Sequence, residues 1–358
     1  MSGQFSEEDI ERELSSPIIV ATIQSLVRRL EDDRTSRALK KWLHERCKLV
    51  ILDESQAYGT KTFEEVFNEI WAPYRIFLSA TPRRTDGATI KLEAASGPCI
   101  FSTTAERQIE QGRLCELDIR YNVFDHKMYN EHDNDIVYQE AYKTCIMEND
   151  KRNLECIVKP TLEMVKEGRH VLVLIQYIDH GHILKKMFLD NGISPDNIRF
   201  IWGDTPNKLR HSAIAEFRKG DFQIMIGSTI FDAGVNIPVI SGVVLGGAGN
   251  SDITLIQRIG RGARTCEYED VLGYLPEFMQ EAHGEKVTKV YDVYDTNVKF
   301  FTKQSKNRYN NACDEFGADR VHIIGEIGKQ RGRKSQKMTD EEMDEAIERF
   351  NSMLNDFM

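Results

Sequence analysis

The sequence predicts an α/β protein built on two doubly wound parallel-sheet domains. Short apolar runs rich in β-branched residues recur at residues 17–22, 49–52, 75–78, 171–175, 198–201, 224–226 and 243–245. These runs are apolar on both faces, as strands are when helices cover each side of a parallel sheet. Helical segments separate the runs, and this alternation is typical of α/β architecture.

The spacing of the apolar runs divides the chain into two domains. We expect four regions: a first domain at 1–120, a polar connecting region at 121–150, a second domain at 151–300 and a C-terminal extension at 301–358. A length of 358 residues is compatible with two domains.

Two helices are predicted from apolar residues at helical spacing. The first has one buried stripe, made of Phe63, Val66, Phe67, Ile70 and Trp71. The second follows a basic run at 329–337 and carries an apolar side made of Met343, Ile347, Phe350 and Leu354.

Composition excludes several classes of protein. Lys and Arg total 47 and Asp and Glu total 57, so the net charge is −10. This acidic total argues against a protein that coats nucleic acid through its overall charge, but it allows a local basic groove. No apolar run approaches the ~20 residues of a membrane helix. The N-terminus is acidic and polar, and the seven cysteines are scattered. We therefore expect a cytoplasmic protein with reduced thiols and no membrane partner.

Paired carboxylates follow one predicted strand. Leu49–Leu52 runs directly into Asp53 and Glu54, at the strand end where α/β sheets bind their ligands. In this position Asp53 can hold Mg²⁺ through water, and Glu54 can orient and deprotonate a water that attacks a γ-phosphate. A strand that simply ends in two solvated acids is the alternative.

Small hydroxyl residues end the next strand, in the segment Leu78–Pro82. Ser79 and Thr81 can link a nucleotide site to a partner domain by hydrogen bonds. A plain turn before proline is the simpler interpretation of this segment taken alone.

Arginines recur at Arg258, Arg261 and Arg264, with glycines between them. Guanidinium groups bind phosphate oxygens in a fork geometry, and the glycines permit close approach. An arginine presented from a second domain to a γ-phosphate supplies roughly 10³–10⁵ in rate. A surface cluster of salt bridges is the alternative, although it has little need of interleaved glycines.

In chain order, these segments resemble the motifs of superfamily 2 helicases, nearest to the phage UvsW-type and XPB-like DNA translocases. The resemblance covers about residues 15–300, and several weak motifs in the correct order are far more specific than any one of them. The matching segments are Val20–Leu26 (motif Ib), Asp53–Gln56 (motif II), Ser79–Thr81 with its flank Arg83–Gly87 (motif III), Val171–Ile175 and the Gly203 segment (motif IV and its follower), Asp232–Pro238 (motif V) and Gln257–Arg264 (motif VI).

The resemblance implies two RecA-like domains that face a cleft, and it implies a role for each matching residue. The implied catalytic residues are Asp53, Glu54, Gln257, Arg261 and Arg264. The residues implied in nucleotide contact or coupling are Gln56, Ser79, Thr81, Asp232, Gly234 and Arg258. The residues implied in nucleic-acid contact are Thr22, Gln24, Arg83, Gly203 and Thr229. Two departures are mild, since Gln56 replaces the more usual His and Asn236 stands where Asp is common.

The resemblance also implies ATP and Mg²⁺ as cofactors, with the metal held by Asp53 through water, and nucleic acid as partner. We expect DNA, on family likeness alone, because contacts to the sugar–phosphate backbone carry no information on DNA against RNA without readers of the 2′-hydroxyl.

One departure from the family is severe. Such motors cradle the β- and γ-phosphates in Gly-x-x-x-x-Gly-Lys followed by Ser or Thr, which would precede motif Ib. Only 16 residues precede Pro17, and they contain one glycine, Gly3. The nearest string, Gly328–Ser335, has Arg333 where the loop needs glycine. We therefore expect an incomplete first domain, with the Walker A segment supplied by a second polypeptide or lost by truncation of the reading frame.

Two other functions remain open. The first is an ATP-independent nucleic-acid-binding or regulatory protein built on a decayed motor, against which the retention of Glu54, Arg261 and Arg264 speaks. The second is the motor half of a restriction or remodelling complex, which fits the same motifs.

Overall fold

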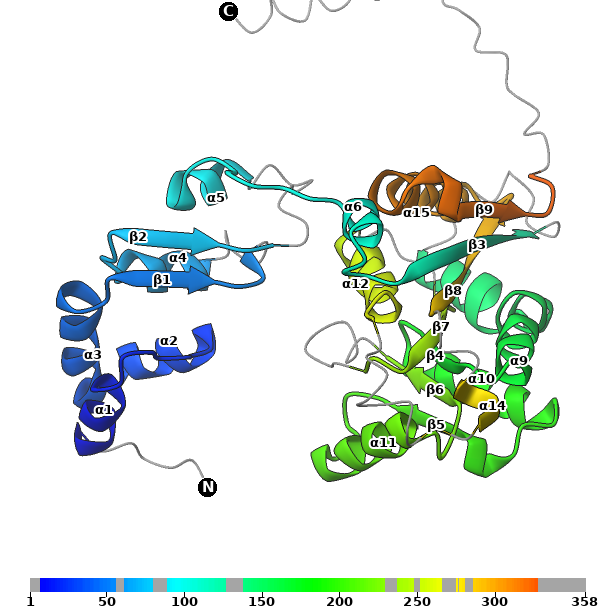
Figure 1. Cartoon of the computed structure of the whole chain (residues 1–358), viewed down its shortest axis with the longest axis horizontal. Coiled ribbons are helices and arrows are strands. Elements are labelled where there is room, and N and C mark those ends of the chain that lie inside the picture. The colour runs from blue at the N-terminus through cyan, green and yellow to red at the C-terminus, as the bar shows by residue number, and fades with distance from the viewer. Residues whose placement is uncertain are drawn as a thin grey trace, which may run out of the picture.

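Two parallel sheets organise the protein. The computed structural model describes residues 7–55, 61–79, 89–126, 138–228, 237–247, 252–265, 275, 277–280 and 286–327. Within these residues one sheet has two strands and the other has seven, and every strand pairing in both is parallel (Figure 1). The predicted α/β class with parallel sheets is confirmed.

The N-terminal unit packs five helices against one face of the two-stranded sheet. Its elements are α1 (Glu7–Leu14), α2 (Ile23–Glu31), α3 (Asp33–Glu45), β1 (Leu49–Leu52), α4 (Lys61–Asn68), β2 (Tyr74–Phe77) and α5 (Thr89–Ser96). Side chains of all five helices form one apolar core with Val50, Leu52 and Phe77. Because successive side chains point to opposite faces of a strand, these helices cover only one face of the sheet.

The C-terminal unit contains the seven-stranded sheet. Its elements are α6 (Ala105–Glu110), β3 (Glu116–Asp125), α7 (Tyr138–Ala141), α8 (Asp150–Asn153), α9 (Lys159–Lys166), β4 (His170–Leu174), α10 (Ile178–Asp190), β5 (Ile198–Ile201), α11 (Asn207–Lys219), β6 (Ile224–Gly227), β7 (Ile240–Leu245), α12 (Asp252–Gly262), α14 (Glu277–Gln280), β8 (Val287–Thr296), α15 (Lys299–Phe316) and β9 (Val321–Ile324). Two π-helical turns follow α7 and α8, at Tyr142–Met147 and Leu154–Val158. The strand order is β5-β6-β4-β7-β8-β3-β9.

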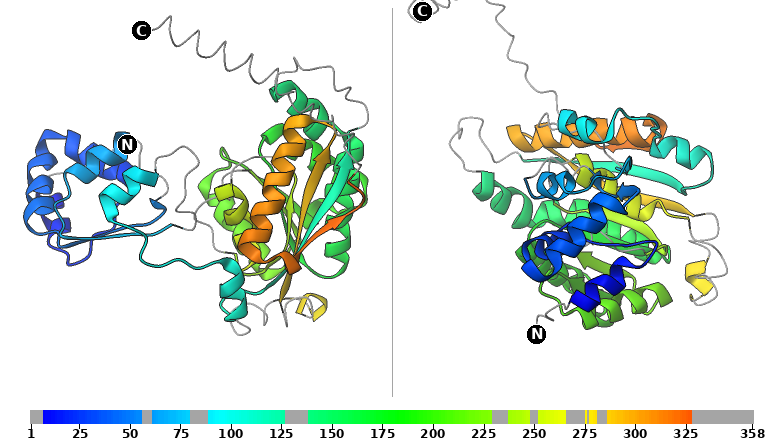
Figure 2. Two further views of the ribbon diagram at one scale, coloured as in Figure 1. Left: turned by 90° about the horizontal axis from the view of Figure 1, so that it is seen from above. Right: turned by 90° about the vertical axis from the view of Figure 1, so that its left-hand side faces the viewer.

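Helices cover both faces of the seven-stranded sheet, as Figure 2 shows. On one face Leu172 and Leu174 of β4 share a core with α11, α12 and α15. On the other face Val171 and Val173 share a core with α9 and α10. The unit is therefore doubly wound, and its strands are apolar on both faces because both faces are buried.

The predicted strand at 17–22 is wrong. These residues form an irregular connection between α1 and α2, and Val20 is 94% exposed. An apolar run becomes a strand only if a neighbouring strand accepts its backbone hydrogen bonds, and no described strand lies beside this run.

The predicted helix at 63–71 is confirmed in part. Val66, Phe67 and Ile70 are buried as expected, but α4 ends at Asn68 and Trp71 is exposed, with its ring stacked on that of His44.

The predicted domain limits differ from the observed units. Strand β3 pairs with β8 and β9, so residues 116–125 belong to the second sheet and not to the first domain or the connecting region. Its buried residues alternate with polar ones, unlike the continuous apolar runs of the other inner strands. Helix α15 and strand β9 also belong to the second unit, which extends beyond residue 300. The basic run at 329–337 and the predicted final helix lie outside the described residues.

Candidate functional site

The acid pair lies at the carboxyl end of β1, as predicted. Asp53 and Glu54 directly follow the strand and are exposed, and the backbone N–H of Glu54 donates to Asp53 Oδ1 at 2.9 Å. The ladder between β1 and β2 continues past the strands, because Leu78 donates to Leu52 O and Ser55 donates to Leu78 O, both at 2.8 Å. Ser79 therefore follows at the same edge of the sheet as the two acids.

Glu54 has an unusual backbone conformation, with φ at +52°. A non-glycine residue in the left-handed region costs of order 1–3 kcal/mol, and such residues are concentrated at functional sites. The strain at Glu54 is thus located at the residue to which the motif assigns chemistry.

Helix α12 carries the predicted arginines. Arg261 lies one turn after Gln257 on the same side of the helix, whereas Arg258 is rotated by about 100° from Gln257 and is buried. Arg264 follows the end of the helix.

The two glycines of this segment differ in what surrounds them. A Cβ at Gly262 would lie 2.6 Å from Thr288 Cγ2 and 2.9 Å from Val243 Cγ2, so Gly262 lets α12 approach the sheet. A Cβ at Gly260 would meet nothing within 4 Å. Close approach therefore explains Gly262 and not Gly260.

Neighbouring segments hold the carboxyl end of α12 in place. Thr288 Oγ1 donates to Gly262 O at 2.8 Å, and Lys286 Nζ donates to Arg264 O at 2.7 Å. The backbone N–H of Cys115, just before β3, donates to Ala263 O at 2.8 Å. These bonds satisfy carbonyls that a helix end leaves without internal partners, and they fix Arg264 relative to the sheet.

The acid pair and helix α12 meet. Gln257 Nε2 donates to Glu54 Oε2 at 3.3 Å, although the two residues are 203 positions apart and belong to different units. Side chains that the sequence assigned to one site thus lie in contact.

The other predicted site residues have different surroundings. Thr22 caps α2, where its Oγ1 accepts from Ser25 N at 3.2 Å, and Gln24 is exposed in the first turn of that helix. Gly203 is exposed in the turn after β5. The remaining predicted positions lie outside the described residues; they are Gln56, Thr81, Arg83, Thr229, Asp232 and Gly234.

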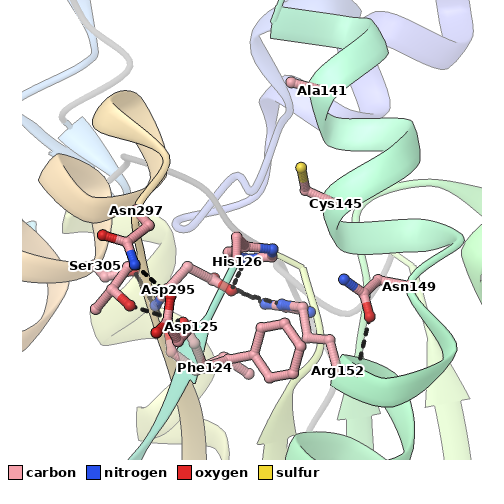
Figure 3. A network of polar contacts seen from close by, with 12 residues as sticks. Phe124, Asp125, His126, Ala141, Cys145, Asn149, Arg152, Asp295, Asn297 and Ser305 are labelled. Carbon is pink, nitrogen blue, oxygen red and sulfur yellow. Dashed lines mark hydrogen bonds and ion pairs between the residues drawn. The ribbon is translucent and has the colours of Figure 1, made fainter. Parts of the chain in front are cut away.

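A buried polar network supports the carboxyl edge of the second sheet (Figure 3). Arg152 donates through Nε and Nη2 to the two carboxylate oxygens of Asp295, at 2.7 and 3.0 Å, and through Nη1 to Gly246 O at 3.2 Å. Asp295 is near the end of β8 and Gly246 directly follows β7, so Arg152 ties two strand ends together. His126 Nε2 lies 2.9 Å from Asp295 Oδ1.

The network shifts the pKa values of its members. Burial by itself would raise the pKa of Asp295, but the charge of Arg152 and the hydrogen bonds from His126 and Arg152 outweigh it and lower the pKa to about 2. Burial would lower the pKa of His126, yet hydrogen bonds with Asp295 and Cys145 raise it. This network was not predicted from the sequence, although acids at 292 and 295 inside an apolar run are a signal of buried charge.

The described parts of the chain hold neither a clustered metal centre nor a membrane-spanning helix. No group of three or more His, Cys, Asp or Glu side chains there is arranged to hold a metal ion. No helix there is long and apolar enough to cross a membrane.

Two family models match separate parts of the chain. A model described as the helicase conserved C-terminal domain matches residues 152–266, and one described as type III restriction enzyme, res subunit, matches residues 2–84. The two matches correspond to the two units of the structure.

Individual relatives agree with these matches. The chain is 26% identical over 263 residues to a yeast (Saccharomyces cerevisiae) protein named as a candidate ATP-dependent helicase, IRC3, with 71% of this chain and 36% of the relative covered. It is 21% identical over 260 residues to the DNA 3′-5′ translocase XPB2 of Sulfurisphaera tokodaii, with 63% and 57% covered. The chain thus spans less than two thirds of the length of these relatives.

A solved structure shares the fold. A fragment assigned as the HsdR subunit of a type I restriction enzyme from Vibrio vulnificus superposes with a TM-score of 0.57 at 17% identity, over 81% of this chain and 50% of that one.

Proposed function

Because this chain is a helicase-type protein of superfamily 2, as its motifs predicted, we propose that it couples ATP hydrolysis to movement on, or remodelling of, DNA. The proposal places ATP between the two units, with Asp53 and Glu54 on one side and Gln257, Arg261 and Arg264 on the other. The observation that carries it is the hydrogen bond between Gln257 and Glu54. Residues that must act on one triphosphate need to reach each other, and these two do.

Glu54 acts as the base in this proposal. Its carboxylate is exposed at the strand end, where it can accept a hydrogen bond from water and then its proton. The water oxygen bonds to the γ-phosphorus while the bond from that phosphorus to the β–γ bridging oxygen breaks, which yields ADP and phosphate. Gln257 orients the Glu54 carboxylate through the 3.3 Å hydrogen bond.

Asp53 is suited to a magnesium ion that is bound largely by substrate and water. Mg²⁺ in nucleotide sites is held by one or two carboxylates plus phosphate oxygens, and Asp53 supplies one exposed carboxylate beside Glu54. The ion, when bound, would neutralise charge on the phosphates. Asp53 Oδ1 already accepts from the backbone N–H of Glu54, which orients the carboxylate.

Arginines from the second unit supply positive charge in this proposal. Arg261 lies on the same side of α12 as Gln257, and Arg264 follows where three hydrogen bonds fix the helix end. Closure of the units around ATP and their opening after hydrolysis would move the second unit relative to the first. The connection between α5 and α6 has no helix or strand at 97–104, which suits it to such motion.

DNA is proposed as the substrate because the name of the archaeal relative describes a DNA translocase. The phosphate-binding loop is proposed to lie in a segment other than these 358 residues, because they contain no Gly-x-x-x-x-Gly-Lys followed by Ser or Thr. The backbone N–H groups and lysine of such a loop are the main ligands of the β- and γ-phosphates.

The test is DNA-stimulated ATP hydrolysis by the chain alone and mixed with the polypeptide from the reading frame directly upstream. We expect almost no turnover alone and clear turnover in the mixture. In the mixture Glu54→Gln should lower the rate by about 10²–10⁴, and Arg264→Ala by about 10³–10⁵. The matched controls Glu31→Gln and Arg107→Ala, both exposed and outside the set of assigned residues, should retain the rate.

Three outcomes contradict parts of the proposal. Rapid hydrolysis by the chain alone refutes the need for an added loop. Full rates in Glu54→Gln and Arg264→Ala refute the assigned roles. An inactive mixture that still binds DNA tightly favours the ATP-independent nucleic-acid-binding protein.

A further inference from the structure

Helix α15 carries a row of exposed lysines. Lys299, Lys303 and Lys306 are all exposed, and at 100° per residue they lie within about 60° of one another around the helix axis. The left view of Figure 2 shows α15 (orange) on the outside of the C-terminal unit. We call these three lysines the basic face.

The basic face keeps its positive charge. Among the described residues none of its lysines forms an ion pair, whereas Lys40 and Lys289 each pair with a glutamate. The acids of α15 are Asp314 and Glu315 in its last turn, and Glu315 accepts from the backbone N–H of Ala105. The chain as a whole has a net charge of −10, so the basic face is a local reversal of the overall sign.

A buried ion pair fixes the direction in which the basic face points. Arg308 lies on the opposite side of α15 from Lys299 and donates through Nε to Asp292 Oδ2 at 2.8 Å and through Nη2 to Val293 O at 2.9 Å. The hydroxyl of Tyr121 donates to Arg308 O at 3.0 Å. Because α15 cannot rotate without breaking these bonds to β8 and β3, the lysines are displayed on a rigid element.

The spacing of the basic face suits the backbone of duplex nucleic acid. At 1.5 Å per residue, the lysines from 299 to 306 span about 10 Å of helix axis. One strand of a duplex carries a phosphate every 3.4 Å of its own axis, so about 10 Å covers three steps. Sites for single strands add aromatic side chains on which bases stack, and the basic face contains none. Lysine contacts to phosphates carry no sequence information, so such a contact would be independent of sequence.

The basic face begins at the carboxyl edge of the seven-stranded sheet. Strand β8 ends at Thr296 and α15 begins at Lys299, while Gly203, to which the family resemblance assigns nucleic-acid contact, follows β5 at the same edge. In the strand order, β5 and β8 are four positions apart, which is about 19 Å at 4.8 Å per strand. A duplex of about six base pairs spans this distance.

We propose that the basic face binds the phosphate backbone of duplex DNA, as a contact outside the motor motifs. The proposal rests on the proposed function for the identity of the nucleic acid. Each lysine that neutralises a phosphate releases a counterion, so this contact makes the affinity depend on salt. The contact requires neither ATP nor closure of the two units, because all three lysines belong to one helix of the C-terminal unit.

The experiment measures binding of the full chain, without ATP, to a fluorescently labelled duplex by anisotropy, between about 50 and 200 mM NaCl. In the variant Lys299→Ala, Lys303→Ala, Lys306→Ala, the slope of log K against log salt concentration should become shallower by about 2.7, or about 0.9 for each lost phosphate contact. At about 100 mM salt, this variant should bind roughly 10²–10³-fold more weakly.

Two further variants separate the basic face from total charge. The control Lys41→Ala, Lys186→Ala, Lys219→Ala removes three exposed lysines from α3, α10 and α11, and it should retain the slope of the original chain. Replacement of all three basic-face lysines with arginine keeps the charge and should retain the affinity.

Folding of each variant is checked by circular dichroism. The basic-face lysines are exposed and alanine is the strongest helix former, so the alanine variant should retain the spectrum of the original chain. If that variant unfolds, the single variant Lys303→Glu takes its place in the anisotropy measurement and should also make the slope shallower.

Several results would overturn the inference. These are an unchanged slope in the alanine variant, an equal change in the control variant, and no binding of duplex by the full chain at about 50 mM salt. A change of slope with single-stranded DNA but not with duplex would show that the assignment to duplex is wrong.

The basic face and the proposed function fail separately. Duplex binding that requires the basic face, in a protein that hydrolyses no ATP in the test above, would support this contact and refute the proposed function. DNA-stimulated hydrolysis that requires Glu54, with duplex binding indifferent to the basic face, would refute this contact and leave the proposed function standing.

Discussion

Replacing Arg152 with methionine should destabilise the C-terminal unit by about 3–5 kcal/mol, the usual cost of removing one partner of a buried ion pair. Arg152 and Asp295 are both fully buried, and three hydrogen bonds of 2.7–3.2 Å join the guanidinium to Asp295 and Gly246. Methionine fills a similar volume but leaves the carboxylate of Asp295 without its main counter-charge. Loss of the bond to Gly246 adds an unsatisfied carbonyl at the end of β7.

The deficit, meaning the unfolding free energy that Arg152→Met loses, should depend on pH, because His126 also contacts Asp295. The charge of Arg152 lowers the pKa of His126, so its removal should raise that pKa further. A histidine whose pKa is raised by folding contributes stability that is fully present below its unfolded pKa and is lost as pH rises through its folded pKa. Protonated His126 would then partly replace Arg152, and the deficit should be smaller at pH 6 than at pH 8.

Urea unfolding of the full chain measures both effects, followed by circular dichroism and by tryptophan fluorescence, with Trp42 and Trp71 replaced by Phe so that Trp202 reports on the C-terminal unit. Arg107→Met, on an exposed arginine, is the matched control. The double variant Arg152→Met, Asp295→Asn should recover part of the loss, since no buried charge remains unpaired. A loss below about 1 kcal/mol at pH 8, or an equal loss at both pH values, would refute the reasoning.

Three further predictions concern single sites. Gly262→Ala should lower the free energy of unfolding by about 1–3 kcal/mol because its Cβ meets Thr288 and Val243. The control Gly260→Ala should be neutral or slightly stabilising, and equal melting temperatures of the two variants would contradict the prediction. Burial and the charge of Arg152 lower the pKa of His180 to about 3 from 6.5. Below pH 6.5 the unfolded chain therefore protonates His180 while the folded chain does not, and the free energy of unfolding should fall with pH, by roughly 2 kcal/mol at pH 5. In urea unfolding measured across this pH range, His180→Gln should flatten the slope of stability against pH. An unchanged slope would count against this explanation. Thr22→Ala should cost about 0.5–2 kcal/mol through loss of the helix cap, and Thr22→Ser should not, as thermal melting would show.

Local pattern was sufficient for the inner strands of the C-terminal unit. Runs such as Val171–Ile175 are apolar on both faces, and only strands buried on both faces require this composition. The run at 17–22 has a similar composition but is not a strand, because within the described residues no strand lies beside it. Strand β3 was not predicted because its apolar residues Leu117, Ile119 and Tyr121 alternate with polar ones instead of forming a continuous apolar run. On the polar side, Asp118 forms an ion pair with Arg120.

The sequence by itself determined which residues stand at strand ends and in what order, because motif spacing and strand periodicity are local properties of the chain. The tertiary structure alone decided that Glu54 meets Gln257 and that Arg152 pairs with Asp295, since contacts over 203 and 143 positions depend on how whole sheets pack. It alone also decided which face of β1 and β2 lies open. The alternating direction of side chains divides the residues of any strand between two faces, but only packing determines which face the helices cover.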